Sequence, residues 1–245
     1  MNTERRDFLI SFGLLGASAL IPGSLLADKN LEETLDVNSP IDGGEANFGI
    51  FKHEKPESLK KIETVKNSTL KKIIVTIDDG PSKYTVPIAK ELDRLGMKGI
   101  FFFLGQNINH YQKEVLEILE KGHDIGNHSY THPEFNKISI KRAVQEVKDT
   151  DNLLRELLSK AGKDENKEMF FRYPYGAKIS KNNSDEFNAF LKQLKLKEMY
   201  WDIDTNDWRK EKSIESVKNS ILKTPDNKIV LVHDREKTLE VLQKV

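Results

Sequence analysis

The sequence predicts an α/β fold in which a mostly parallel sheet is joined by crossover helices. From residue 71 onward, short runs of β-branched and aromatic residues alternate with longer stretches whose apolar residues recur three and four positions apart. Six expected strands and six expected helices follow one another in this way, and such alternation is typical of parallel strands. The chain has 245 residues, enough for one sizeable domain with a core. We expect either an open, doubly wound sheet or a closed barrel.

The six expected strands are short and dominated by apolar residues. The first, KIIVTID, is a β-branched run typical of a buried strand. The aromatic run KGIFFFL and the later runs EMFFRYP and KIVLVHD have the same character. In order, the strands are expected over residues 72–78, 98–104, 123–127, 168–174, 198–204 and 228–234.

The six expected helices are amphipathic stretches between these strands. Gly96 and Gly122 stand at the ends of the first two, where glycine favours helix termination. Ser139 is a suitable N-cap for the third and longest helix. In order, the helices are expected over residues 85–96, 111–122, 139–162, 185–195, 213–223 and 237–245.

The N-terminal part of the chain differs from this pattern. In residues 1–27, Arg5 and Arg6 precede an uncharged stretch that runs to Ala27, the layout of an export signal that resembles the twin-arginine type. An uncleaved membrane anchor is the alternative, although the stretch is near the lower limit for spanning a bilayer. We expect export to the periplasm or cell envelope, signal cleavage and no stable membrane insertion afterwards. Residues 28–70 are interpreted as a linker and N-terminal arm, and residues 71–245 as the functional domain.

The composition excludes several classes of function. Lys plus Arg and Asp plus Glu both number 39, so the formal net charge is zero, and no basic stripe indicates a nucleic-acid partner. The chain has no cysteine, which excludes disulfides, thiolate metal sites and a cysteine nucleophile. Any metal must therefore be bound by nitrogen and oxygen ligands.

Ionisable residues end five of the six expected strands. Because the carboxyl ends of parallel strands share one face of the fold, these side chains are expected to converge there. Loops are polar in general, but that explanation predicts serine, glycine, asparagine and lysine as well as the aspartate, histidine and arginine found here. The residues are Asp78, Asp79, His128, Arg172, Asp202, Asp204, His233 and Asp234.

A pair of histidines, His128 and His132, is the first candidate for metal binding. Their spacing suits Zn²⁺, but two histidines four apart often occur by chance. The convergence of strand ends strengthens the metal interpretation, since two histidines and one carboxylate with an open position make a hydrolytic site. Asp78 and Asp79 are adjacent, so in an extended segment one can bind the metal while the other accepts a proton from water. A simple turn with the following Gly-Pro pair is the alternative for the two aspartates.

Other polar residues at the strand ends suit supporting roles. Arg172 can orient the proton-accepting carboxylate, and we also expect it to form a buried ion pair with Asp204. His233 can protonate a leaving group, or it can be a satisfied core histidine. Trp201 and Trp208 are packing residues by default, although Trp208 near the expected mouth can form a wall of the site. Together these groups suit hydrolysis of an amide or ester.

The motifs resemble those of the polysaccharide deacetylases of the NodB-homology type, also called carbohydrate esterase family 4. The resemblance covers residue 71 to the C-terminus. Five motifs match in order: TIDDG, HSYTH, RYPYG, DTNDW and LVH. The resemblance implies a distorted, incomplete (β/α) barrel of about six to seven parallel strands with outer helices. Isoleucine replaces the usual phenylalanine at position 77, and the sequence stops 12 residues after His233, so we expect the barrel to close by other means, such as the N-terminal arm.

The resemblance also implies a role for each motif residue. The metal ligands would be Asp79, His128 and His132, which would hold one divalent ion, Zn²⁺ first and Co²⁺, Mn²⁺ or Ni²⁺ as alternatives. Asp78 would be the catalytic base and His233 the general acid. The remaining residues would orient these groups or bind substrate: Arg172 orients the base, Asp204 supports Arg172, the Tyr175 backbone N–H binds the oxyanion, Leu231 contacts the acetyl methyl, and Trp208 lines the groove.

The expected function is that of an exported, metal-dependent hydrolase. It would remove N-acetyl or O-acetyl groups from a glycan such as peptidoglycan or another N-acetylglucosamine polymer, and would act as a monomer. Two alternatives remain: a catalytically silent glycan-binding protein on the same fold, and a hydrolase of small cyclic amides.

Overall fold

The computed structural model describes residues 72–245. The expected export signal, the linker and the N-terminal arm lie outside the described residues. Within the described part, none of the helices combines the length and apolar character needed to cross a membrane.

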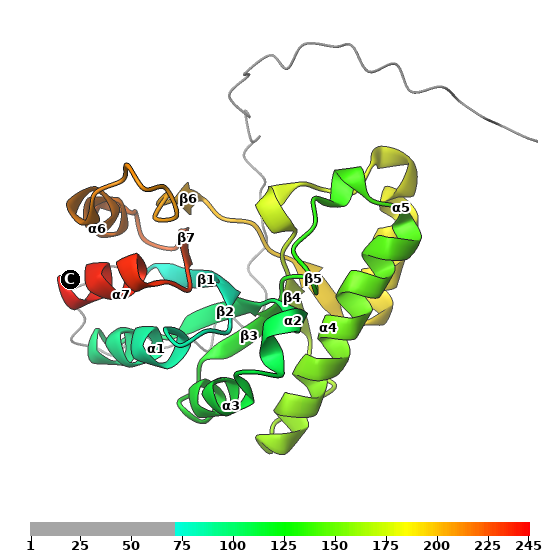
Figure 1. Cartoon of the computed structure of the whole chain (residues 1–245), viewed down its shortest axis with the longest axis horizontal. Helices are drawn as coiled ribbons and strands as arrows, with labels where there is room; N and C mark the ends of the chain where they lie inside the picture. Colours follow the sequence, from blue (N-terminus) through cyan, green and yellow to red (C-terminus); the bar gives the residue numbers. More distant parts are fainter. Residues whose placement is uncertain (1–71) are drawn as a thin grey trace, which may run out of the picture. The chain divides into compact units, whose positions relative to one another are not determined.

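Seven parallel strands form one curled sheet (Figure 1). Their order across the sheet is β5-β4-β3-β2-β1-β7-β6, which puts the first strand near the middle. The predicted α/β class, with six to seven parallel strands, is confirmed. The strands are β1 (Ile74–Gly80), β2 (Gly99–Phe103), β3 (Asp124–Asn127), β4 (Met169–Phe171), β5 (Leu196–Glu198), β6 (Ile203–Asp204) and β7 (Ile229–His233).

Helices cover the outer face of the sheet (Figure 1). Neighbouring helices pack on one another in the order α6, α7, α1, α3, α4 and α5, so the layer follows the curvature of the sheet. The helices are α1 (Thr85–Arg94), α2 (Gly105–Ile108), α3 (Gln112–Glu120), α4 (Ile140–Lys160), α5 (Ser184–Gln193), α6 (Ile214–Lys223) and α7 (Glu236–Gln243). Only the single-turn α2 was not expected from the sequence.

The strands separate their side chains between two apolar clusters. Alternate residues of β1, such as Val75 and Ile77, join the large cluster under the helices. Ile74 joins a smaller cluster with Ile100 and Phe102 on the opposite face, inside the curl of the sheet. Because side chains alternate along a strand, Thr76 and Asp78 follow Ile74 onto this inner face. The side chain of Asp78, the candidate base, is thereby directed into the interior of the curled sheet.

The prediction of a single strand over residues 198–204 is wrong. The chain leaves β5 at one edge of the sheet and enters β6 at the other edge. Five residue steps span at most about 18 Å, whereas seven flat strands would extend over about 29 Å, so the sheet must curl. Met199 N–H donates to Phe171 O, and Asp202 N–H to Ile229 O, each at 2.9 Å. The barrel is therefore bridged by residues 199–202, a segment that the sequence analysis assigned to a strand.

Candidate metal centre and active site

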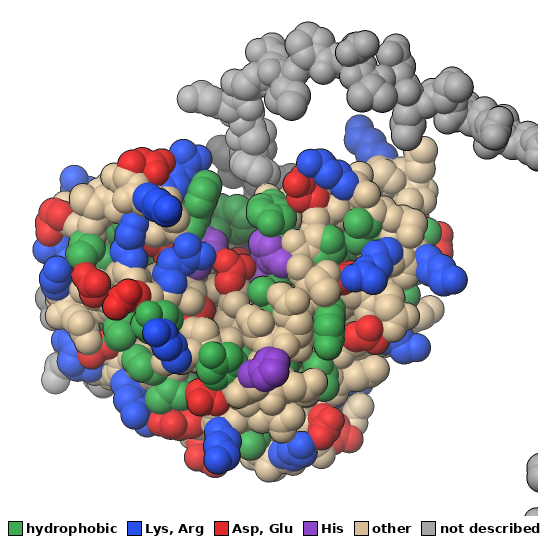
Figure 2. Space-filling model, viewed as in Figure 1, with side chains coloured by type: hydrophobic (Ala, Val, Ile, Leu, Met, Phe, Trp, Pro, Cys, Tyr) green, Lys and Arg blue, Asp and Glu red, His purple; other side chains and the backbone are tan. Residues whose placement is uncertain are grey.

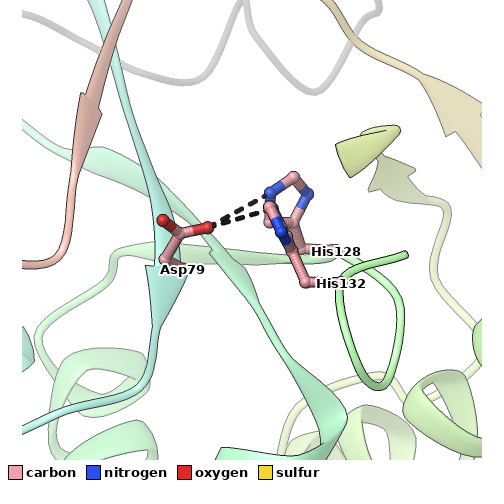
Figure 3. Close-up of side chains that lie close together, drawn as sticks. All are labelled: Asp79, His128 and His132. Carbon is pink, nitrogen blue, oxygen red and sulfur yellow. Dashed lines mark ion pairs between the residues drawn. The ribbon is translucent and has the colours of Figure 1, made fainter. Parts of the chain in front are cut away.

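Three predicted metal ligands meet at the carboxyl ends of β1 and β3 (Figure 3). Asp79 Oδ1 lies 3.3 Å from His132 Nε2 and 3.6 Å from His128 Nε2. One ligand atom from each side chain lies within 4.8 Å of the others. This spacing lets one small ion contact all three side chains.

Hydrogen bonds orient the two histidines. His128 Nδ1 donates to the carbonyl oxygen of Arg172 at 2.9 Å, which leaves its Nε2 lone pair facing Asp79. Ser129 Oγ accepts from the His132 backbone N–H at 3.1 Å and so braces this loop. Burial and the nearby His128 lower the pKa of His132 to about 4, although the charges of Asp79 and Asp78 act in the opposite direction. His132 is therefore neutral at physiological pH, the state in which imidazole binds a metal.

The cluster has the properties of a cation site. Asp79 Oδ1 is buried and has no hydrogen-bond partner among the described residues, although it faces both imidazoles. Burial alone would raise the pKa of Asp79, but the neighbouring His128, with His233 and His132, outweighs burial and holds that pKa well below its usual range. A carboxylate and two imidazoles fit a divalent ion such as Zn²⁺ with an open coordination position.

Backbone conformation aims these side chains at one another. Asp79, Ser129, His132 and Tyr175 have φ values of 71°, 69°, 63° and 56°, in the left-handed region that most non-glycine residues avoid. Residues held in this region often cluster at functional sites, where surrounding contacts keep them in place. In the loop of His132, those contacts come from the buried carboxylate of Glu146.

Arg172 is fully buried behind the metal cluster and is satisfied there by hydrogen bonds. Its Nη1 donates to Asp78 Oδ1 and to Thr76 Oγ1, each at 2.8 Å. Its Nε and Nη2 donate to the carbonyl oxygens of Met199 and Tyr200, each at 3.0 Å. The guanidinium also lies 4.2 Å from the centre of the Phe102 ring. The predicted contact between Arg172 and Asp78 is therefore present.

The expected ion pair between Arg172 and Asp204 does not form among the described residues. Asp204 Oδ1 instead accepts from the backbone N–H of Asn206 at 2.8 Å, in a turn that follows β6. The main-chain carbonyls of residues 199 and 200 occupy the Arg172 donors that Asp204 was expected to satisfy. The bridge between β5 and β6 thus takes over this supporting role, which could not be foreseen while residues 198–204 were expected to form one strand.

Asp207 holds His233, the predicted general acid. Asp207 Oδ1 accepts from His233 Nδ1 at 2.7 Å, and Oδ2 accepts from the His233 backbone N–H at 2.8 Å. Burial lowers the pKa of His233, but the hydrogen bond and charge of Asp207, with the charges of Asp78 and Asp79, raise that pKa overall. The imidazolium form of His233 is thereby favoured.

A pocket of about 430 Å³ joins these groups. Figure 2 shows histidine, acidic and apolar side chains gathered around a hollow in this face. All predicted site residues except the deeply buried Arg172 line the pocket. Tyr175 is 63% exposed and Trp208 is 46% exposed, so both can contact a large substrate, whereas Leu231 is buried at 3%.

Three residues with roles at the site were not singled out from the sequence. Asp207 lies in the DTNDW motif, but the motif does not show which of its aspartates reaches His233. Arg235 donates to Asp79 Oδ2 at 3.3 Å and lines the pocket. Glu146, on α4, accepts from the backbone N–H groups of Tyr130 and Thr131, between the two histidine ligands. The long helical pattern around Glu146 gave no sign of this buried contact.

Comparison with known proteins decides the family. A family model described as polysaccharide deacetylase matches residues 66–215. The chain belongs to the polysaccharide deacetylase family. The membership predicted from the five motifs is confirmed.

Two similar proteins are named as peptidoglycan deacetylases. A peptidoglycan-N-acetylmuramic acid deacetylase of Bacillus subtilis is 28% identical over 237 residues, or 94% of this chain and 46% of that protein. A peptidoglycan-N-acetylglucosamine deacetylase of Listeria monocytogenes is 29% identical over 240 residues, or 96% of this chain and 46% of that protein. The chain thus spans about half the length of these curated relatives. A family 4 carbohydrate esterase from Streptomyces lividans, solved with acetate, matches with a TM-score of 0.59 and 25% identity over 70% of this chain and 84% of that one.

Proposed function

We propose that this chain is an exported, metal-dependent deacetylase of a cell-wall glycan. The observation that carries the proposal is the joint placement of Asp78, His233 and the Asp79, His128 and His132 cluster in one pocket. The names of the relatives favour an N-acetylated sugar of peptidoglycan as substrate. The catalytic activity of the whole protein, its export and its requirement for a metal are all parts of this proposal.

Asp79, His128 and His132 would hold the ion. When bound, a divalent ion supplies Lewis-acid polarisation of the acetyl carbonyl and lowers the pKa of the attacking water. The neutral state of His132 and the tautomer of His128 prepare both imidazoles for this role. Zn²⁺ is the first choice for such a ligand set, with Co²⁺, Mn²⁺ or Ni²⁺ as alternatives.

Asp78 would accept the proton of the attacking water. Its Oδ1 is held by Arg172, and its Oδ2 lies 3.5 Å from His128 Nε2, on the side of the cluster. The charge-assisted bond from Arg172 fixes the direction of the carboxylate. Arg172 therefore acts as a positioning residue for the base.

His233 would protonate the departing amine. Asp207 binds its Nδ1, which leaves Nε2 as the group able to deliver a proton. The raised pKa of His233 favours retention of that proton. Base and acid thus have separate hydrogen-bond partners, Arg172 and Asp207, which allows one group to be ionised while the other is protonated.

The acetyl group would be bound by residues of the same pocket. Leu231 is buried in the pocket wall and can contact the methyl group. The Tyr175 backbone N–H would bind the developing oxyanion, and the exposed Trp208 ring would contact the sugar as a wall of the groove. Asp204 lines the pocket without touching Arg172, so we assign it no catalytic step.

Acetate release from defined glycans tests this proposal. The purified chain, stripped with a chelator and reloaded with Zn²⁺ or Co²⁺, is incubated with peptidoglycan, chitin oligosaccharides, poly-N-acetylglucosamine or acetylated xylan. We expect acetate from an N-acetylated glycan only after reloading, and none from the Asp78→Asn variant. Absence of acetate from all four substrates, with the ion bound, would leave the chain as a silent glycan-binding protein.

A further inference from the structure

Arg235 is a cationic side chain of the pocket that the proposed mechanism does not use. It follows β7 and lines the pocket beside the metal ligands. Its Nη2 donates to Asp79 Oδ2 at 3.3 Å, on the oxygen opposite to the one that faces the histidines. Its side chain is 35% exposed, so part of the guanidinium can be reached from the pocket.

The contact with Asp79 leaves most of the guanidinium without a partner. Arginine has five N–H donors, and Nη2 to Asp79 is its one side-chain hydrogen bond within residues 72–245. Nε is buried and unpaired there, which is costly for a charged donor. A cation bound to Asp79 would offset the negative charge of that carboxylate. The positive charge of Arg235 would then be compensated less by Asp79.

Arg235 supplies the one permanent side-chain cation among the described residues that line the pocket. Arg172 lies behind the wall and is committed to Asp78, Thr76 and two main-chain carbonyls. An anionic group on a substrate would therefore meet Arg235 first.

We propose that Arg235 binds a carboxylate carried by the same sugar whose acetamido group is cleaved. This inference rests on the proposed function. In the proposed mechanism the acetamido carbonyl would point to the metal ligands, so a substituent on the adjacent ring carbon would lie close to them, and Arg235 is one hydrogen bond from the ligand Asp79. The planar fork of arginine matches a carboxylate. The substrate class is an N-acetylated sugar with a carboxylate ether beside the acetamido group, the chemistry of N-acetylmuramic acid.

Four substrates separate the sources of a carboxylate. Peptide-free glycan strands carry the free ether carboxylate, and the same strands after amidation carry none. Strands with intact peptides have the ether carboxyl blocked in an amide but keep the peptide carboxylates, and chitin oligosaccharides lack both. With Zn²⁺ at saturation, we expect kcat/KM on peptide-free strands to exceed that on amidated strands by about tenfold or more. The preference should weaken with added salt, because the pair is partly exposed.

Two variants assign this preference to Arg235. Arg235→Gln should bring the ratio between free and amidated strands close to one, and Arg235→Lys should keep part of it, since lysine retains the charge without the fork. Any effect of the substitution on ion binding through Asp79 changes kcat/KM for all substrates by the same factor, so it cancels in the ratio. The ion content of each variant, measured by mass spectrometry, checks this separately.

The outcomes distinguish the inference from the proposed function. A chain that releases no acetate from any of the four substrates would overturn both. A chain that releases acetate but treats free and amidated strands alike would overturn the inference alone, as would an Arg235→Gln variant that keeps the wild-type ratio. A preference for strands with intact peptides would assign the carboxylate to the peptide and also overturn the inference.

Discussion

The two aspartates that end β1 have different partners, although they are adjacent in the chain. Asp78 accepts from the buried Arg172, and Asp79 faces the two imidazoles of His128 and His132. The left-handed conformation of Asp79, at φ 71°, helps direct its carboxylate toward the histidines. One residue can thereby serve as the base while its neighbour binds the ion.

The role of His233 predicts a dependence on the leaving group. His233→Ala should retain the ion, because His233 is outside the ligand set. Turnover of an N-acetylated glycan should fall by about a hundred- to ten-thousandfold, the usual effect of one proton donor. Hydrolysis of an activated phenyl acetate should fall much less, because its leaving group needs no acid. Equal losses on amide and ester would contradict the general-acid role.

The contact between Asp207 and His233 predicts a shift in the pH profile. The raised pKa of His233 means that its acid form persists to higher pH than that of an ordinary histidine, and activity is lost as pH rises past that pKa. Asp207→Asn removes the charge that offsets burial, so the pKa of His233 should fall and the alkaline limb should move to lower pH. A charge-assisted hydrogen bond suggests a shift of about one to two pH units. The profile of kcat/KM on an N-acetylated glycan measures it, and an unchanged alkaline limb would refute the assignment.

At this scale the sequence indicated which residues converge but not all of their contacts. Strand ends and motifs brought Asp78, Arg172 and His233 together correctly, because parallel strands present their carboxyl ends on one face. The predicted ion pair of Arg172 with Asp204 was wrong, and the partner of His233 was missed. Both depend on the path of residues 199–207, where the choice among three nearby aspartates is a matter of loop geometry.

Among the elements, helix α4 supports the loop that carries both histidine ligands. Glu146 is buried at 2% exposure and accepts from Tyr130 N–H at 2.8 Å and Thr131 N–H at 2.6 Å. It also accepts from Thr131 Oγ1 at 2.7 Å and pairs with Arg142 at 2.5 Å. A single carboxylate on a long helix thereby fixes the backbone between His128 and His132.

Replacement of Glu146 should therefore weaken metal binding without touching a ligand. Glu146→Ala leaves the N–H groups of Tyr130 and Thr131 without this acceptor and should reduce affinity for Zn²⁺ by about ten- to a hundredfold, as for other residues that orient ligands. Glu146→Gln keeps one acceptor oxygen and should lose less. Competition with a chromophoric chelator measures the affinity, and a thermal melt of each variant shows whether the fold is retained. Wild-type affinity in a folded Glu146→Ala variant would show that the loop holds its shape without this carboxylate.

The elements also show where the pattern of apolar residues stops being informative. Helices and buried strands have clear periodicities, and five of the six expected strands appear near their predicted positions. The run EMYWDID has the composition of a strand, yet its middle residues cross between the sheet edges. An apolar composition indicates that a segment is buried, but not that it pairs as a strand. Tyr200 packs against Tyr173 and Trp201 against Arg172, so both rings are partly buried without strand pairing.

For the whole molecule, curling of the sheet brings distant segments to one pocket. The groups proposed for catalysis come from strand ends between residues 78 and 233, and β1 lies next to β7 in the sheet. Asp78 and His233 are directly paired in register, so the proposed base and acid stand on adjacent strands. The bridge at residues 199–202 holds Arg172 from the opposite side.

Export is a prediction of the whole chain that rests on its sequence. Replacing Arg5 and Arg6 with lysine should trap the precursor in the cytoplasm if the twin-arginine route is used. Fractionation followed by immunoblotting compares the variant with the wild-type chain, and Lys29→Arg is a matched control that leaves the arginine pair intact. Normal export of the double lysine variant would assign the segment to the general secretory route or to an anchor.

The measurement that tests the account most directly combines ion content and acetate release in two variants. The wild-type chain should bind about one divalent ion and release acetate from an N-acetylated glycan. Asp78→Asn should bind the ion equally well and release almost no acetate, because Asp79 is the ligand and Asp78 the base. The His128→Ala/His132→Ala variant should lose both the ion and activity while remaining folded by circular dichroism. Full ion content in the double histidine variant, or loss of the ion in Asp78→Asn alone, would contradict the assignment.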